Sequence, residues 1–151
     1  MKNIIRKYVG KKYKHNGREG TLDCLGLVVS FLRDNGIEIP FDDGKRIDKN
    51  WYEKEPQRLV EGFAQYGNVI LFEKLQPLDV IIFALDKETP THIGVMVDNM
   101  KFLHIVENST ARLSRIKHWK KYFYTAFRIE RGGNYGSRSS SRSSYRWIRR
   151  C

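Results

Sequence analysis

The chain has 151 residues, the size of one ordinary domain that can bury a core without disulfide staples. Hydrophobic residues make up 40% of it, and no apolar run approaches the roughly 18 residues that a membrane helix needs, so a globular protein without a membrane span is expected. The net charge of +11 is typical of a protein that binds nucleic acid or an anionic surface, although a merely basic soluble protein is the commoner cause.

The first predicted element is a short helix. Apolar residues recur at helical spacing between residues 4 and 9, and Gly10 closes the pattern. The start of the chain is basic like a signal peptide, but no continuous apolar stretch or small-residue cleavage site follows. Three interpretations of localisation therefore stay open: a cytoplasmic protein, a mature form without its signal, or a protein exported by other means, such as assembly into a phage particle.

A second helix is predicted to begin at Cys24, after a polar loop over residues 11–21. Apolar residues between Leu25 and Leu32 form one helical face, and Asn35-Gly36 is a typical helix end. Cys24 is therefore expected in the first turn of a buried helix, with Asp23 as its N-cap.

The middle and end of the chain predict a turn, a helix and then strands. Residues 40–44 read as a turn, and Pro56 is expected to be the first residue of a helix that reaches Tyr66 and stops at Gly67. Short β-rich runs follow at 69–72, 80–83, 92–97, 102–106 and 122–129. Helices followed by strands indicate an α+β domain with an antiparallel sheet.

Residues 132–151 form a tail rich in Ser, Arg and Gly. It carries five arginines and no acid, which leaves +6 for the rest of the chain. Without an apolar period it is expected to be disordered, and a flexible or artificial extension is preferred to a basic arm for nucleic acid. The folded domain is thus expected over residues 1–131.

Cys24 and two histidines make a candidate for nucleophilic catalysis. A helix N-terminus stabilises a thiolate, and a histidine can take and return a proton near neutral pH. His92 and His104 lie in neighbouring strand runs joined by a turn at Asp98-Asn99, so a hairpin is expected to bring both imidazoles to one face within hydrogen-bonding reach. His104 can then orient His92, as the third member of a triad does.

Each of these residues also has a plainer interpretation. A lone buried cysteine is usually an inert apolar residue, and a strand histidine is more often a satisfied polar residue than a catalyst. His15 is expected to be an exposed loop residue, although it could line the cleft, and His118 has no evident partner. No spacing typical of a metal site occurs, so neither a metal nor a cofactor is expected.

Three runs of the sequence favour the catalytic interpretation over the plainer one. They begin at Asp23 (Asp-Cys-Leu-Gly-Leu-Val), at Leu75 (Leu-Gln-Pro-Leu-Asp-Val-Ile-Ile-Phe) and at His92, ending at His104. In this order and at these separations they resemble the NlpC family of bacterial cell-wall cysteine peptidases over about residues 3–130. The Asp-Cys-Leu-Gly pattern is closest to members associated with phage tails.

The resemblance implies a papain-like fold and a cysteine endopeptidase that hydrolyses peptidoglycan stem peptides. It assigns Cys24 as nucleophile, His92 as base and His104 as orienting residue. It also makes Asp23 a candidate to bind the free amine of a stem peptide, and Tyr13 a candidate to bind substrate or stabilise the oxyanion. As alternatives, Asp23 is simply the helix cap and Tyr13 packs on the core.

The sequence departs from the family on the substrate side. Leu25 replaces the serine that usually follows the cysteine, and residues 14–17 replace a Trp-Gly-Gly run. The departures bear on specificity more than on thiol chemistry. Two alternatives stay open: the same triad acting as an amidase, deamidase or transpeptidase, or a phage-tail structural protein or basic binding module with a degenerate site. Phage tail proteins are then possible partners, whereas a nucleic-acid partner is not expected.

Overall fold

The structure, a computed structural model, describes residues 1–15, 22–39 and 51–130, without the side chain of Lys54. The helical elements are α1 (Lys2–Tyr8), α2 (Cys24–Asp34), α3 (Trp51–Lys54), α4 (Arg58–Ala64) and the 3-10 helices η1 (Phe72–Lys74) and η2 (Ile116–Tyr122). The strands are β1 (Gly67–Val69), β2 (Val80–Phe83), β3 (His92–Met96), β4 (Lys101–His104), β5 (Arg112–Arg115) and β6 (Phe123–Ile129). Among these elements, no helix has the length and apolar character needed to cross a bilayer.

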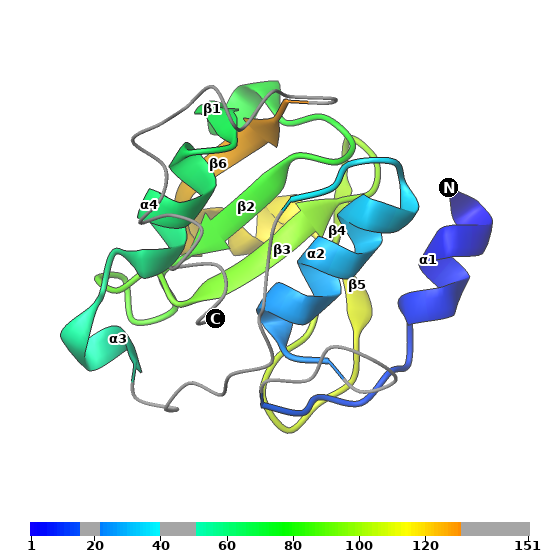
Figure 1. Cartoon of the computed structure of the whole chain (residues 1–151), viewed down its shortest axis with the longest axis horizontal. Helices are drawn as coiled ribbons and strands as arrows, with labels where there is room; N and C mark the ends of the chain where they lie inside the picture. Colours follow the sequence, from blue (N-terminus) through cyan, green and yellow to red (C-terminus); the bar gives the residue numbers. More distant parts are fainter. Residues whose placement is uncertain (16–21, 40–50, 131–151) are drawn as a thin grey trace.

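The strands form one antiparallel sheet in the order β1-β6-β2-β3-β4-β5. Strands β2 to β5 pair with their neighbours in the chain, whereas β6 returns to lie between β1 and β2. Helix α2 packs on β3 and β4, and α4 lies near β1 and β6 on the same side of the sheet (Figure 1). The predicted α+β fold, with helices packed on an antiparallel sheet, is confirmed.

Two apolar clusters lie on the two faces of the sheet. Strand residues of the larger cluster pack with α2 and α4, and they include Val80, Ile82, Ile93, Val95 and Leu103. Alternate residues of the same strands belong to a smaller cluster with η1 and η2, and they include Ile81, Phe83, Met96 and Phe102. Because strand side chains alternate between faces, each residue of β3 or β4 faces either the helices or η2.

Helix α2 is buried along most of its length, from Leu25 to Leu32. Its predicted ends are confirmed. Asp23 is the N-cap, and its Oδ1 accepts a hydrogen bond from the Gly26 N–H at 2.7 Å. Beyond the other end, Gly36 adopts a left-handed conformation with φ of 86°, which glycine tolerates without strain.

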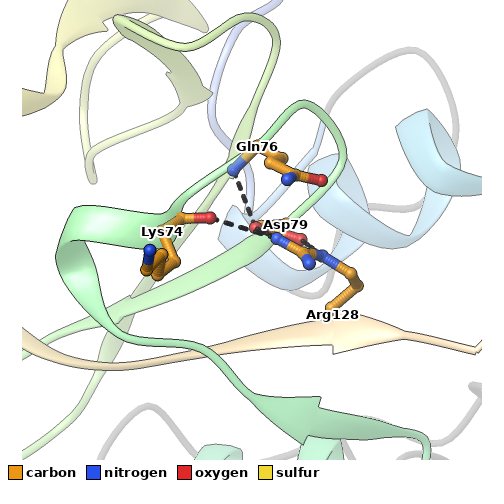
Figure 2. Close-up of polar contacts among 4 residues, drawn as sticks. All are labelled: Lys74, Gln76, Asp79 and Arg128. Carbon is orange, nitrogen blue, oxygen red and sulfur yellow. Dashed lines mark hydrogen bonds and ion pairs between the residues drawn. The ribbon is translucent and has the colours of Figure 1, made fainter.

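A partly buried ion pair joins the start of β2 to β6 (Figure 2). Asp79, whose side chain is 1% exposed, accepts two hydrogen bonds from the Arg128 guanidinium, both at 2.9 Å, and one from the Gln76 N–H at 2.8 Å. Arg128 also donates to the Lys74 carbonyl at 3.1 Å. The Asp79 carboxylate raises the pKa of Arg128. The Leu-Asp-Val run recognised in the sequence thus has a structural role at this strand junction.

Several predicted element boundaries are wrong. The helix expected from Pro56 begins at Arg58, because residues 56 and 57 form a turn, and it ends before Tyr66. Gly67 does not stop that helix but starts β1, so the strand expected at 69–72 lies earlier. Strand β5 and both 3-10 helices were not predicted. The expected turn at 40–44 and the tail at 132–151 lie outside the described residues.

Candidate active site

Cys24 is the first residue of α2, as predicted, and its side chain is half-buried. The first turn of a helix presents N–H groups without intrahelical partners and the positive end of the helix dipole. Both favour a thiolate over a thiol. The Asp23 carboxylate already serves as the helix cap, so any contact of Asp23 with a substrate has to coexist with this hydrogen bond.

Tyr13 is held beside Cys24 by backbone pairing on two sides. The Tyr13 N–H donates to the Ser109 carbonyl at 3.0 Å, and Tyr13 also forms a parallel bridge with Leu22, two residues before Cys24. Burial, followed by the negative charges of Cys24, Asp23 and further acidic groups, raises the pKa of Tyr13. The phenol therefore keeps its proton at neutral pH and can act as a hydrogen-bond donor.

His92 and His104 form a buried pair on β3 and β4. His104 pairs in register with Gly94, which places it on the same sheet face as His92, two residues away. The His92 Nε2 lies 2.9 Å from the His104 Nδ1, so the hairpin contact expected from the sequence is present. The turn between the strands is built by Asp98, whose Oδ1 accepts hydrogen bonds from the N–H groups of Met100 and Lys101.

Aromatic side chains of the smaller cluster enclose this pair. Trp119 of η2 stacks on His92 with a centroid distance of 5.8 Å and meets His104 edge-on at 4.7 Å. Phe83 and Phe102 contact the two imidazoles from the sheet. The contacts leave His92 only 5% exposed and His104 fully buried.

Burial keeps both imidazoles neutral. It lowers the pKa of His92 to about 4, and the positive charge of Arg112 acts in the same direction. Burial, His92 and Arg112 together lower the pKa of His104 to about 3. At neutral pH in the resting protein, His92 is therefore an unprotonated base that can accept a proton.

One cleft brings most of the predicted residues together. It has a volume of about 290 Å³ and opens at the end of the sheet where β3 begins and α2 starts. Its polar lining consists of Tyr13, His15, Asp23, Cys24, Tyr52, Thr91, His92 and Glu107. Apolar walls come from residues that include Trp51, Leu59, Leu85 and Ile105. His104 lies behind His92 and does not line the cleft.

Gly94 of β3 leaves space for the Phe102 ring beside the histidine pair. A Cβ at this position would lie 2.7 Å from the Cδ2 of Phe102 and 3.1 Å from the Leu103 carbonyl oxygen. The ring of Phe102 in turn packs against His104 with a centroid distance of 4.4 Å. The glycine in the His-Ile-Gly run therefore makes room for the ring that supports the second histidine.

Sequence reasoning missed several residues of this region. His15 was expected to be an exposed loop residue, but it is half-buried and lines the cleft. Glu107, Ser114 and Trp119 were not identified, because their contacts depend on strand register and on a 3-10 helix that has no clear sequence signal. The tryptophan in a Lys-rich run was the one available signal for Trp119. His118 is exposed, and no group of three His, Cys, Asp or Glu residues suited to a metal occurs within the described part of the chain.

Comparison with known proteins identifies the family. Residues 10–128 match the NlpC/P60 family model. The chain belongs to the NlpC/P60 family. The resemblance seen in the three sequence runs is therefore confirmed, and the papain-like α+β fold is that of the NlpC/P60 family. No curated protein matches the chain significantly in sequence.

Solved structures of NlpC/P60 proteins share this fold. An NlpC/P60 family protein from Bacillus cereus is 22% identical with a TM-score of 0.62, and NlpC2 from Trichomonas vaginalis is 23% identical with a TM-score of 0.62. The matches cover 85% and 84% of this chain but only 38% and 44% of those longer chains. The NlpC/p60 domain of the peptidoglycan hydrolase SagA, 14% identical with a TM-score of 0.56, is matched over 85% of this chain and 95% of its own.

Proposed function

We propose that residues 1–131 form a cysteine peptidase domain that hydrolyses amide bonds in peptidoglycan stem peptides. Cys24 is the nucleophile, His92 the base and His104 the residue that orients it. The observation that carries this proposal is the cleft in which Cys24, at a helix N-terminus, and His92, backed by His104 at 2.9 Å, both lie. Membership of the NlpC/P60 family and the likeness to the SagA hydrolase domain support this substrate class.

The chemistry follows from the positions of these groups. His92 takes the thiol proton of Cys24, and the thiolate sulfur bonds to the scissile carbonyl carbon. N–H groups at the start of α2 stabilise the oxyanion of the tetrahedral intermediate. Its collapse breaks the C–N bond, and His92 gives its proton to the leaving amine. Water, activated by His92, then cleaves the thioester and returns the thiol.

Tyr13 and Asp23 are proposed to bind the substrate. The protonated phenol of Tyr13 lies in the cleft with Cys24 and can donate a hydrogen bond to the substrate or to the oxyanion. Asp23 and Glu107 make this part of the cleft acidic, which suits the free amine of a stem peptide. We expect an amine-bearing peptide to be preferred to its acetylated form.

Mass spectrometry of purified peptidoglycan fragments incubated with the protein tests this function. We compare the parent chain with Cys24→Ala and, as a matched control, with Cys151→Ala. New termini that appear with the parent and the control but not with Cys24→Ala establish peptidase activity and identify the bond. An unchanged rate in Cys24→Ala would falsify the assigned nucleophile. Product masses also separate endopeptidase cleavage from amidase, deamidase or transpeptidase chemistry.

A non-enzymatic role is the alternative outcome. The departures at Leu25 and residues 14–17, together with the net charge of +11, motivate a structural phage-tail protein or basic binding module with a degenerate site. Absence of cleavage, combined with slow alkylation of Cys24 by iodoacetamide at neutral pH, would favour this role over a peptidase.

A further inference from the structure

The histidine pair continues to a third polar side chain that the mechanism above does not use. The Oγ of Ser114 lies 2.8 Å from the Nε2 of His104, and the Nδ1 of His104 lies 2.9 Å from the Nε2 of His92. Three side chains from three neighbouring strands, β3, β4 and β5, thus form one hydrogen-bonded row. This row ends at the nitrogen of His92 that remains available to the cleft, Nδ1.

Ser114 is oriented toward this row by its strand. Strand β5 lies at the edge of the sheet, and its other three residues, Arg112, Leu113 and Arg115, are exposed. Ser114 alone is half-buried, and it pairs in register with Phe102, two residues before His104. The imidazole of His104 is fully buried, so the serine hydroxyl supplies a hydrogen-bond partner for its outer nitrogen.

The direction of the hydrogen bonds is fixed once His92 is charged. An imidazolium has N–H on both nitrogens, so the Nε2 of His92 must then donate to the Nδ1 of His104. A neutral His104 that accepts on Nδ1 carries its proton on Nε2, and that N–H must donate to an acceptor. The Oγ of Ser114 is the acceptor in place. A serine hydroxyl suits this position because its oxygen can accept without carrying charge.

We propose that Ser114 is a positioning residue that accepts a hydrogen bond from the Nε2 of His104 and so holds His92 in the tautomer and charge state that activate Cys24. The proposal rests on the function proposed above. Through His104, the hydroxyl stabilises the His92 imidazolium that forms when the Cys24 proton is transferred. Loss of the hydroxyl therefore lowers the thiolate fraction of Cys24 at neutral pH.

Charged groups around the row influence how readily His92 takes up a proton. Arg112, two residues before Ser114 on β5, lowers the pKa of both histidines. On the cleft side, His92 shares the lining with the titratable groups Tyr13, His15, Asp23, Cys24, Tyr52 and Glu107. Trp119 closes the remaining side without charge. Arg112 thus opposes positive charge on the pair, and the Ser114 oxygen supplies a compensating dipole at the outer nitrogen of His104.

The matched variants Ser114→Thr and Ser114→Val test this role, because they have the same shape and differ by a hydroxyl against a methyl group. Both are made in the full chain with Cys151→Ser, so that iodoacetamide reports on Cys24 alone. We expect the Thr variant to keep the parent alkylation rate. The Val variant should react roughly 3- to 10-fold more slowly at pH 7, with the pH midpoint of alkylation raised by about half a unit to one unit.

Nitrogen NMR of the imidazoles in the parent protein gives a second readout that depends on neither folding of a variant nor peptidase activity. We expect His92 and His104 both to carry the proton on Nε2 at rest. Equal alkylation profiles for the Thr and Val variants, or a His104 protonated on Nδ1, would overturn the proposal. If the parent protein does not cleave stem peptides but the Thr and Val variants still differ in alkylation rate, the proposed substrate is wrong. The positioning role of Ser114 then stands.

Discussion

The buried histidine pair makes stability depend on pH. An unfolded histidine binds a proton near its ordinary pKa of 6.5, whereas the pKa of folded His92 is about 4 and that of His104 about 3. Between the folded pKa values and pH 6.5, the unfolded state therefore binds more protons than the folded state. The free energy of unfolding must fall as the pH falls from 6.5 toward 4. We expect a loss of about 2 kcal/mol for each histidine, or about 4 kcal/mol for the pair, between neutral pH and pH 5, measured by urea denaturation.

A variant without one imidazole provides the control for this pH dependence. His104→Gln removes one titrating group and should flatten the slope between pH 6.5 and 5, even if its stability at pH 7 is lower. His118→Gln, an exposed residue, should leave the slope unchanged. A slope equal in all three proteins would mean that the pair does not cause the acid sensitivity.

A methyl group added at Gly94 would clash with the Phe102 ring, which packs against His104. In Gly94→Ala the new Cβ lies 2.7 Å from the Phe102 ring, which is fully buried and packs on His104. Overpacking of this kind should cost about 1–3 kcal/mol in the free energy of unfolding, and it should also slow Cys24 alkylation. Thermal denaturation and iodoacetamide kinetics measure the two effects.

A double variant distinguishes a clash with Phe102 from a general loss of stability. The double variant Gly94→Ala/Phe102→Leu removes ring atoms from the clash, so its destabilisation should be smaller than the sum of the two single variants. Strict additivity would contradict a clash between these two positions.

At the scale of elements, strands with a continuous apolar sequence were predicted best. Residues 80–83 are all buried, and their run of Val, Ile, Ile and Phe gives the strand bounds without ambiguity. Strand β5 was missed because its sequence, Arg-Leu-Ser-Arg, has no buried apolar face at the edge of the sheet. The start of α4 was misplaced because Pro56 occupies a turn rather than the first helical position.

The candidate site was predictable only where motif and local geometry agree. Cys24 at a helix start and the His92–His104 hairpin follow from residue types and short spacings. Ser114 does not, because its contact with His104 depends on the register of a strand that the sequence does not reveal. Glu107 likewise enters the cleft through a loop whose path is set by pairing with the N-terminal segment.

The Asp79–Arg128 pair is a bidentate polar link between the start of β2 and strand β6. Asp79→Asn removes the charge that receives the bidentate guanidinium and should lower the free energy of unfolding by about 1–3 kcal/mol. Urea denaturation measures the loss. Lys74→Ala serves as control, because the described contact of Lys74 with Arg128 uses its backbone carbonyl, and this variant should match the parent. Similar losses in both variants would argue against the ion pair.

At the scale of the whole molecule, the charge of the cleft opposes that of the chain. The net charge is +11, yet Asp23 and Glu107 both line the cleft. Glu107→Gln should raise the KM for a peptide with a free amine by up to roughly 5-fold, and it should leave the KM for the acetylated peptide unchanged. Steady-state kinetics with the two peptides measure the difference.

The control for this prediction is an acid outside the cleft. Glu73→Gln changes the net charge equally on exposed η1 and should leave both KM values at those of the parent. Equal effects of the two substitutions would mean that the overall charge, and not the cleft, governs binding of the amine.

The backbone pairing of Tyr13 with Ser109 also has a consequence for synthesis in the cell. The segment that carries Tyr13 is held by residues 109–111, and the proposed base for Cys24, His92, is held by His104. A ribosome makes Cys24 before these partners, so a nascent chain carries Cys24 without its proposed catalytic partners until they have emerged. The proposed reactive centre is therefore completed only after residues 92–111 have emerged and paired with the earlier segment.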